Sequence, residues 1–196
     1  QVTITITDNE TAPTVTLTSS TNSIAENGAG TVTLTATISG ATYEDTTVNL
    51  STTGTSTVNN DYSYTTSISI SAGSTTGTSI INILNDNIFE TNETVIIDIS
   101  SVSGGGATEN GTQQETITIT NDDSAPTLTL TSSSSSVDEN GSAITLTGTL
   151  SNPTYQTVTV GISASGTATL NTDYTLSATS FTITAENTTG SVTATP

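Results

Sequence analysis

The chain contains no lysine, arginine, histidine, cysteine, methionine or tryptophan. Without lysine or arginine there is no basic patch to neutralise phosphates, so we expect no nucleic-acid partner. Histidine and cysteine catalysis, lysine Schiff bases and zinc sites of the usual Cys/His kind are excluded as well. No disulfide bond can form, so the thiol content does not indicate the compartment. No apolar run approaches the ~20 residues of a membrane-spanning helix, so we expect no membrane insertion of this segment.

What remains is acidic and rich in Ser and Thr: 18 acids give the 196 residues a formal net charge of −18. Disordered, mucin-like tracts also combine a low charge density with a high Ser/Thr content. However, Thr alternates with Ile, Val or Leu in many short segments, for example in TITIT and TLTLT. A disordered chain has no reason to keep a period of two, so the pattern predicts folded β structure.

The sequence repeats itself after about 112–113 residues, which is typical of a tandem array. Residues 11–123 form one complete repeat and residues 124–196 an incomplete one, while residues 1–10 resemble the last strand of a preceding repeat. The matching positions include Pro13 with Pro126, Glu26 with Glu139, Gly28 with Gly141, Gly54 with Gly166, and Asp61 with Asp173.

Seven strands are predicted in the complete repeat, from the alternation and from the turn residues between the segments. Seven short strands without a helical period predict an all-β fold, an immunoglobulin-like β-sandwich with apolar residues inside and Thr outside. The predicted ranges are 14–18, 31–39, 47–52, 64–71, 77–84, 94–100 and 115–120.

The direction of the strands predicts where the acids of this repeat lie. If successive strands alternate in direction, then the first, third and fifth connections share one end of the sandwich with the end of the last strand. Seven acids fall in or beside these segments: Glu26, Asp61, Asp86, Glu90, Glu93, Asp122 and Asp123.

Such a cluster needs a counter-ion, because the chain has no cationic side chain to pair with it. Unit charges ~4–6 Å apart repel by about 3–4 kcal/mol at an effective dielectric of ~20. Carboxylate, Asn and carbonyl oxygens together favour a hard cation, and Ca²⁺ fits best because it accepts 6–8 oxygens. The alternative is that the acids only make the loop tips soluble.

Four segments of the complete repeat resemble the Calx-β family, named after the regulatory domains of sodium–calcium exchangers. They are SIAENG, GTSTVNNDYSY, INILNDNIFETNETV and TITNDD, in the family's order, and GTATLNTDYTL repeats the second of them. The resemblance implies a seven-stranded sandwich that binds Ca²⁺ at one end. Asn85, Asn87 and Asn121 stand where better calcium-binding members have acids, which lowers the expected charge of the site. The implied ligands are Glu26, Asp61, Asp86, the carbonyl of Ile88, Glu90, Glu93, Asp122 and Asp123.

Long arrays of such repeats resemble giant bacterial surface adhesins, including gliding-motility adhesins. We therefore expect an extracellular repeat of a bacterial cell-surface adhesin fibre, whose partners are the neighbouring repeats of the same chain. Ca²⁺ at the joints would stiffen this stalk. Asp45-Thr46-Thr47 and Asp123-Ser124-Ala125 also resemble the short O-glycosylation motif of some gliding bacteria.

A glycan- or protein-binding adhesion module is the alternative function, with surface glycans or other cells as partners. Tyr43 and Tyr155 recur between the second and third strands of their repeats, where they serve either sugar stacking or packing against a neighbouring domain. We expect no enzyme, because the acids lie at a tip and no aromatic-lined cleft accompanies them.

The incomplete repeat has no counterpart of the last two strands, since residues 191–196 match residues 78–83. We expect the polypeptide to continue with these strands; strands from a neighbouring chain are the alternative. Glu139 and Asp173 would form half a metal site. Without the missing strands, the sequence predicts exposed side chains at Val158, Val160, Ile162 and Ile183.

Overall fold

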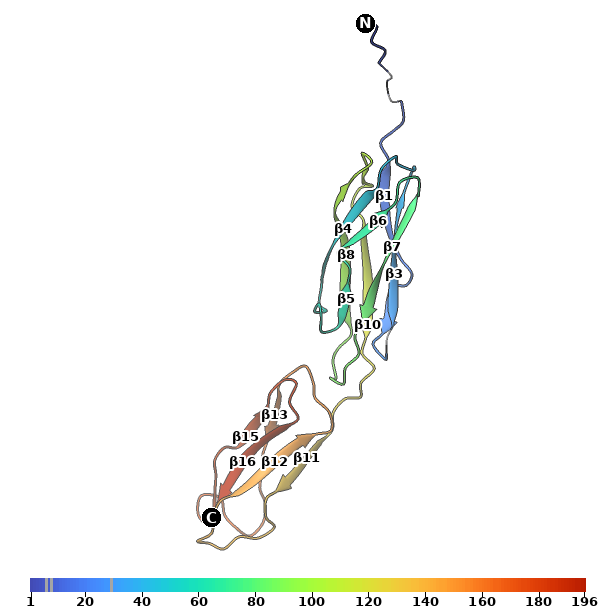
Figure 1. Ribbon diagram of the computed structural model, residues 1–196. Coiled ribbons are helices and arrows are strands. Elements are labelled where there is room, and N and C mark those ends of the chain that lie inside the picture. Colours follow the sequence, from blue (N-terminus) through green and yellow to red (C-terminus); the bar gives the residue numbers. More distant parts are fainter. Residues whose placement is uncertain (6, 8, 29) are drawn as a thin grey trace. The chain divides into compact units, whose positions relative to one another are not determined.

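The computed structural model describes residues 1–196 with the exception of residues 6, 8 and 29, and it divides into two compact units (Figure 1). Unit 1 comprises Gln1–Asn85 and Asn92–Asn121, and unit 2 comprises Asp86–Thr91 and Asp122–Pro196. The segment 86–91 therefore belongs to unit 2, although the strands on either side of it in the sequence belong to unit 1.

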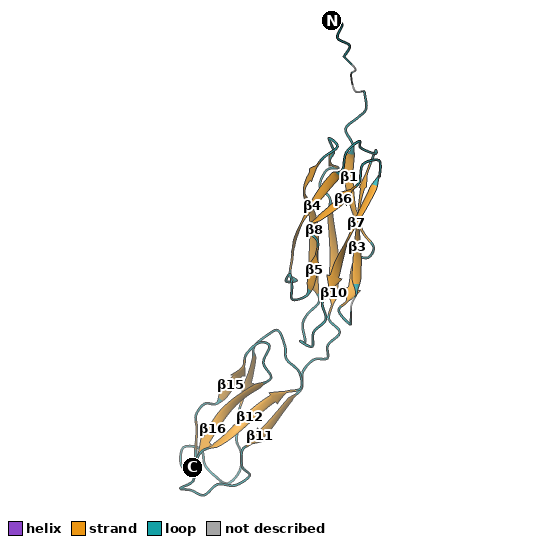
Figure 2. Ribbon diagram, in the orientation of Figure 1, coloured by secondary structure: helices purple, strands orange, loops and turns teal. Residues whose placement is uncertain are grey.

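Unit 1 is built from strands and loops alone within the described residues (Figure 2). Among those residues, no helix is long and apolar enough to cross a membrane. The strands of unit 1 are β1 (Thr14–Ser19), β2 (Ser23–Ala25), β3 (Thr31–Ile38), β4 (Thr46–Gly54), β5 (Tyr62–Tyr64), β6 (Ser67–Ile70), β7 (Thr76–Ile83), β8 (Glu93–Ser103), β9 (Thr108–Glu109) and β10 (Gln114–Thr120).

These strands form two sheets with the orders β5-β7-β3-β1-β9 and β2-β10-β8-β4-β6. The alternation seen in the sequence becomes an inner and an outer face, because successive side chains of a strand point to opposite sides. In β3, for example, Val32, Leu34 and Ala36 are fully buried, while the Thr residues between them are only partly buried. The predicted all-β sandwich is confirmed.

One predicted strand is wrong in one respect, because it divides between the two sheets. The strand predicted at 64–71 consists of β5, which pairs with β7, and β6, which pairs with β4. The first strand continues beyond β1 as β2, which leaves the sheet of β1 and pairs in parallel with β10. Such a crossing lets one chain segment close both sheets of the sandwich.

Unit 2 contains a smaller core and fewer strands. Its sheets have the orders β11-β12-β16-β14 and β13-β15. Leu128 and Leu130 of β11 are 46% and 51% exposed, whereas the matching Val15 and Leu17 of β1 are 0% and 4% exposed. The strands of unit 2 are β11 (Leu128–Ser132), β12 (Ile144–Leu150), β13 (Val158–Gly161), β14 (Thr175–Leu176), β15 (Ser180–Ile183) and β16 (Thr189–Thr195).

The prediction of which side chains unit 2 exposes is therefore wrong in part. Val160 and Ile183 are buried, because β13 and β15 pair with each other and pack in one cluster with Leu150, Phe181 and Val192. Val158 and Ile162 are partly buried against the same cluster. Leu128 and Leu130 of β11 are exposed instead.

Two sequence predictions concern segments outside these sheets. No strand is assigned among the described residues of 1–10, and Ile6 and Asp8 of that segment lie outside the described residues, so the strand there stays a prediction. Of the two glycosylation candidates, Thr46 is fully buried and therefore inaccessible in the folded unit, whereas Ser124 is exposed.

Candidate functional site

The strand register of unit 1 brings one set of strand ends together. Tyr62 of β5 pairs with Ile83 of β7, and Asn82 of the same strand pairs with Thr31 of β3. In the other sheet, Ile119 of β10 pairs both with Glu93 of β8 and with Ile24 of β2. We call this set the acidic end of unit 1: the ends of β2, β7 and β10 and the beginnings of β3, β5 and β8.

Glu26 lies at the acidic end directly after β2. Its backbone N–H donates to the carbonyl of Thr120 at 3.2 Å, and its own carbonyl accepts from the N–H of Gly28 at 2.5 Å. The side chain is only 5% exposed. A carboxylate at such a depth needs polar or cationic partners, because burial disfavours the charged form.

Asp61 lies directly before β5 in a turn that also gives it a structural role. One carboxylate oxygen accepts the N–H of Thr57, and Asn59 adopts a left-handed φ of 69° between them. The same turn recurs in unit 2, where Asp173 accepts the N–H of Thr169 at 2.6 Å. The turn uses one carboxylate oxygen and leaves the second available for another partner.

Glu93 is the first residue of β8, and its carboxylate lies beside that of Asp61. Oxygen atoms of the two side chains lie within 4.8 Å of each other. Unit 1 thus brings together two acids that are far apart in the sequence, as the alternation of strand directions predicts. Two such charges repel, and a cation between them would reverse the sign of this interaction.

The segments 86–91 and 122–123 form a second acidic group within unit 2. Carboxylate oxygens of Asp86 and Asp123 lie within 4.8 Å of each other. Asp86 also accepts the N–H of Ile88 at 2.7 Å, which folds the segment into a tight turn. Burial, together with the charges of Asp122 and Asp86, raises the pKa of the Asp123 carboxyl above its usual range.

In the sequence, the acids of this second group stand close to strands of unit 1. Asp86 follows the last residue of β7 by three positions, and Glu90 precedes the first residue of β8 by three. Asp122 follows the last residue of β10 by two positions.

Glu139 and Asp173, the predicted half site of the second repeat, both line one hollow of unit 2. Its volume is about 500 Å³, and its wall also includes Val137, Ile144 and Tyr174. Both carboxylates are exposed. The hollow is open and largely apolar, so it differs from the acidic end of unit 1.

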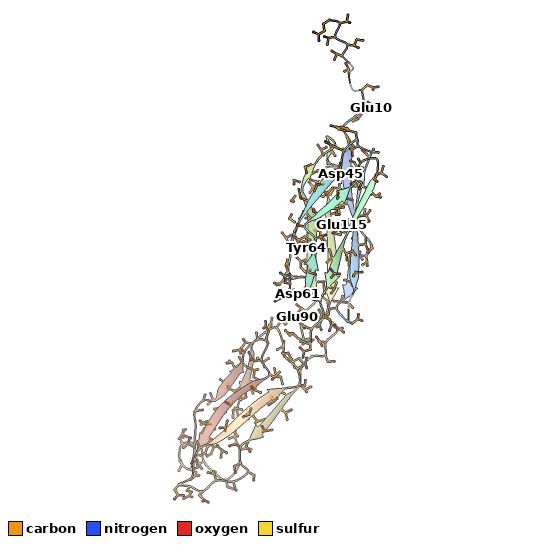
Figure 3. All side chains as sticks on the ribbon, viewed as in Figure 1. Glu10, Asp45, Asp61, Tyr64, Glu90 and Glu115 are labelled. Atoms are coloured by element: carbon orange, nitrogen blue, oxygen red, sulfur yellow. The ribbon has the colours of Figure 1, made fainter. Side chains whose placement is uncertain are left out.

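Several other acids brace loops rather than gather at the acidic end. Asp45 accepts the N–H of Ala72 at 2.8 Å, and Glu44 accepts the N–H of Gly105 at 2.8 Å. Asp98, in the middle of β8, accepts from the side chain of Gln114 at 2.9 Å. Figure 3 shows Asp45 and Asp61 towards opposite ends of unit 1. Solubility alone therefore does not account for the distribution of the acids.

Phe89, which belongs to none of the predicted ligand residues, makes specific contacts in unit 2. Its N–H donates to the carbonyl of Pro153 at 3.0 Å, and its carbonyl accepts the N–H of Tyr155 at 3.2 Å. The only signal in the sequence was an isolated aromatic residue in an acidic loop, in a chain with two phenylalanines.

Comparison with known proteins gives one family match. The family model of the Calx-beta domain matches residues 8–123 and again residues 121–194. No curated protein matches the chain.

Solved structures also resemble the chain. The crystal structure of the apo form of the Calx CBD1 domain is 19% identical with a TM-score of 0.47, covering 56% of this chain and 99% of that one. CBD12 from CALX1.2 is 19% identical with a TM-score of 0.46, covering 88% of this chain and 70% of that one. The calcium binding domain CBD12 of CALX1.1 is 17% identical with a TM-score of 0.45, covering 88% of this chain and 71% of that one.

Proposed function

Because the chain belongs to the Calx-beta family, we propose that it is a calcium-binding structural repeat of a long extracellular adhesin fibre. The observation that supports calcium most directly is the acidic end of unit 1. There Asp61 and Glu93 bring carboxylate oxygens within 4.8 Å of each other, in a chain without any cationic side chain. A hard divalent cation relieves that repulsion and uses oxygen ligands only.

The donor chemistry of the residues present fits calcium. Glu26, Asp61 and Glu93 are the candidate ligands of unit 1, and the segments 86–91 and 122–123 offer carboxylates and the carbonyl of Ile88 as candidates in unit 2. Bound calcium would supply positive charge to the acidic end and hold its loops together. Glu139 and Asp173 are the corresponding candidates of the second repeat. The candidate ligands in the segments 86–91 and 122–123 are Asp86, Ile88, Glu90, Asp122 and Asp123.

Calcium binding is tested by calorimetric titration of the 196-residue chain with Ca²⁺, with Mg²⁺ as the comparison. The double variant Asp61→Asn with Glu93→Gln removes two charges and keeps the side-chain shapes. We expect it to weaken calcium binding by about tenfold or more, because affinity follows the charge of the ligands.

The matched control for this titration is Asp98→Asn, which removes a charge in the middle of β8, and it should bind like the unchanged chain. An equal loss in the control would assign the effect to net charge. No heat of binding in the unchanged chain, confirmed by equilibrium dialysis, would contradict the proposal.

The adhesin part of the proposal rests on the tandem repeat and on the composition. A fibre outside the cell is exposed to proteases, and trypsin cleaves only after Lys and Arg, which this chain lacks. We expect an antibody against residues 1–196 to label intact bacterial cells that produce the protein. The label should survive trypsin and be lost after a protease of broad specificity. Labelling only after permeabilisation would contradict a surface location.

A further inference from the structure

Phe89 joins the segment 86–91 to another loop of unit 2. Its backbone forms a one-residue parallel bridge with Thr154 in the loop between β12 and β13. Its N–H donates to the carbonyl of Pro153, and its carbonyl accepts both the N–H of Tyr155 and the hydroxyl of Thr154, at 3.2 Å each. On the side of the segment these bonds are made by the backbone of Phe89, so they depend on its backbone geometry rather than on its side chain.

The loop between β3 and β4 of unit 1 is built in the same way as this accepting loop. Gly73 donates its N–H to the carbonyl of Thr42 at 2.9 Å, just as Glu186 donates to Thr154 at 2.9 Å. Where the two loops begin, the N–H groups of Ser39 and Ser151 donate at 2.9 Å each to matching carbonyls, those of Thr14 in β1 and of Thr127 directly before β11. Ala41, Thr42 and Tyr43 therefore correspond to Pro153, Thr154 and Tyr155 in structure as well as in sequence.

In unit 1, however, no isolated bridge joins another described segment to this loop. Within the described part of the chain, neither the carbonyl of Ala41 nor the N–H of Tyr43 forms a hydrogen bond. The hydroxyl of Thr42 donates to the carbonyl of Glu44 at 2.7 Å instead. Tyr43 is 88% exposed, whereas Tyr155 is 37% exposed.

The loop lies beside a hollow that can admit an extended segment. The hollow has a volume of about 690 Å³, and Ala41, Thr42, Tyr43 and Pro13 belong to its wall. Gly105 and Gly106 also line the hollow, without side chains. A Cβ at Gly105 would overlap the side chain of Thr42, so glycine is required for residues 42 and 105 to lie this close together.

We propose that this hollow is a docking site for the segment that corresponds to 86–91 in another copy of the repeat. One residue of the incoming segment would bridge Thr42, donate its N–H to Ala41 and accept from Tyr43, as Phe89 does in unit 2. This is strand addition reduced to a single residue. The inference rests on the duplicated loop and not on the proposed calcium site. The occupant follows from complementarity, since the two free backbone groups of this loop are those that Phe89 uses in its counterpart.

The test adds a repeat before the full chain: residues 1–123 are followed directly by residues 11–196. In the second copy, Tyr43→Trp introduces the sole tryptophan, because the chain has none. If the upstream segment docks, the accessibility of this tryptophan to acrylamide should fall roughly twofold relative to Tyr43→Trp in the 196-residue chain. This ratio follows from the exposed fractions of Tyr43 and Tyr155, 88% and 37%.

Variants of the upstream copy identify the contact. Phe89→Pro removes the donating N–H and should restore full quenching, whereas Asn87→Ala, at an exposed neighbouring position, should leave the protection unchanged. Tyr155→Trp in the 196-residue chain, with and without Phe89→Pro, calibrates the size of the effect. Full quenching in the extended chain, both with calcium and with chelator, would overturn the proposal. Protection that survives Phe89→Pro would overturn it as well, because another surface would then cover the loop.

Discussion

Replacement of Gly54 by alanine is expected to lower the free energy of unfolding of unit 1 by about 3 kcal/mol or more. Gly54 ends β4 with a φ of +122°, a conformation that side chains rarely adopt and that costs ~1–3 kcal/mol. A Cβ there would also overlap the carbonyl oxygen of Thr94 in β8 and lie 2.9 Å from its carbonyl carbon. The backbone of β8 cannot move aside without breaking its pairing with β10 and β4.

Alanine at two other glycines separates the cost of the backbone conformation from the cost of the steric overlap. Gly73 has a φ of +79° but open space around a Cβ, so Gly73→Ala should cost only the conformational part, ~1–2 kcal/mol. Its counterpart in unit 2 is Glu186, at a φ of 63°, which shows that a side chain is tolerated there. Gly40→Ala has neither problem and should be nearly neutral. Urea unfolding, followed by hydrogen exchange in the core strands of unit 1, measures all three; equal losses would contradict this explanation.

Much of the sandwich could be predicted from the sequence because the alternation of apolar residues with Thr and the turn residues between the strands are local signals. A period of two marks a strand that has one buried face, and β3 and β10 lie within one residue of their predicted ranges. The division of 64–71 into β5 and β6 depends instead on which sheet each half joins. The exposed face of β11 likewise depends on which strands cover it. Partners distant in the sequence decide such features, so alternation alone cannot reveal them.

The candidate site, too, could be predicted from the sequence only in part. Alternating strand directions were enough to place Asp61 and Glu93 at one end, since this needs only the order of the strands. The turn that occupies one oxygen of Asp61 contains the left-handed Asn59. The second repeat keeps an asparagine there, Asn171 with a φ of 65°, but the alternation of strands carries no information about this turn. The docking of Phe89 was missed because its contacts are made by backbone atoms, which every residue has.

Saturating calcium is expected to raise the free energy of unfolding of the chain. A ligand that binds only the folded state adds about 2.7 kcal/mol at a ~100-fold excess over its Kd. For a domain of this size the melting temperature should rise by roughly 10 °C, and chelator should reverse the shift. Thermal unfolding followed by circular dichroism, at millimolar calcium and in chelator, gives both values.

The double variant Asp61→Asn with Glu93→Gln should invert the order of stabilities. In chelator it lacks the repulsion between two carboxylates whose oxygens lie within 4.8 Å, so it should be at least as stable as the unchanged chain. The asparagine that replaces Asp61 keeps an oxygen that can accept the N–H of Thr57, so the turn before β5 is retained. In calcium the variant should be the less stable of the two, because it has lost two anionic ligands. Asp98→Asn should retain the full calcium response, and a double variant that also retained it would show that these acids do not bind the ion.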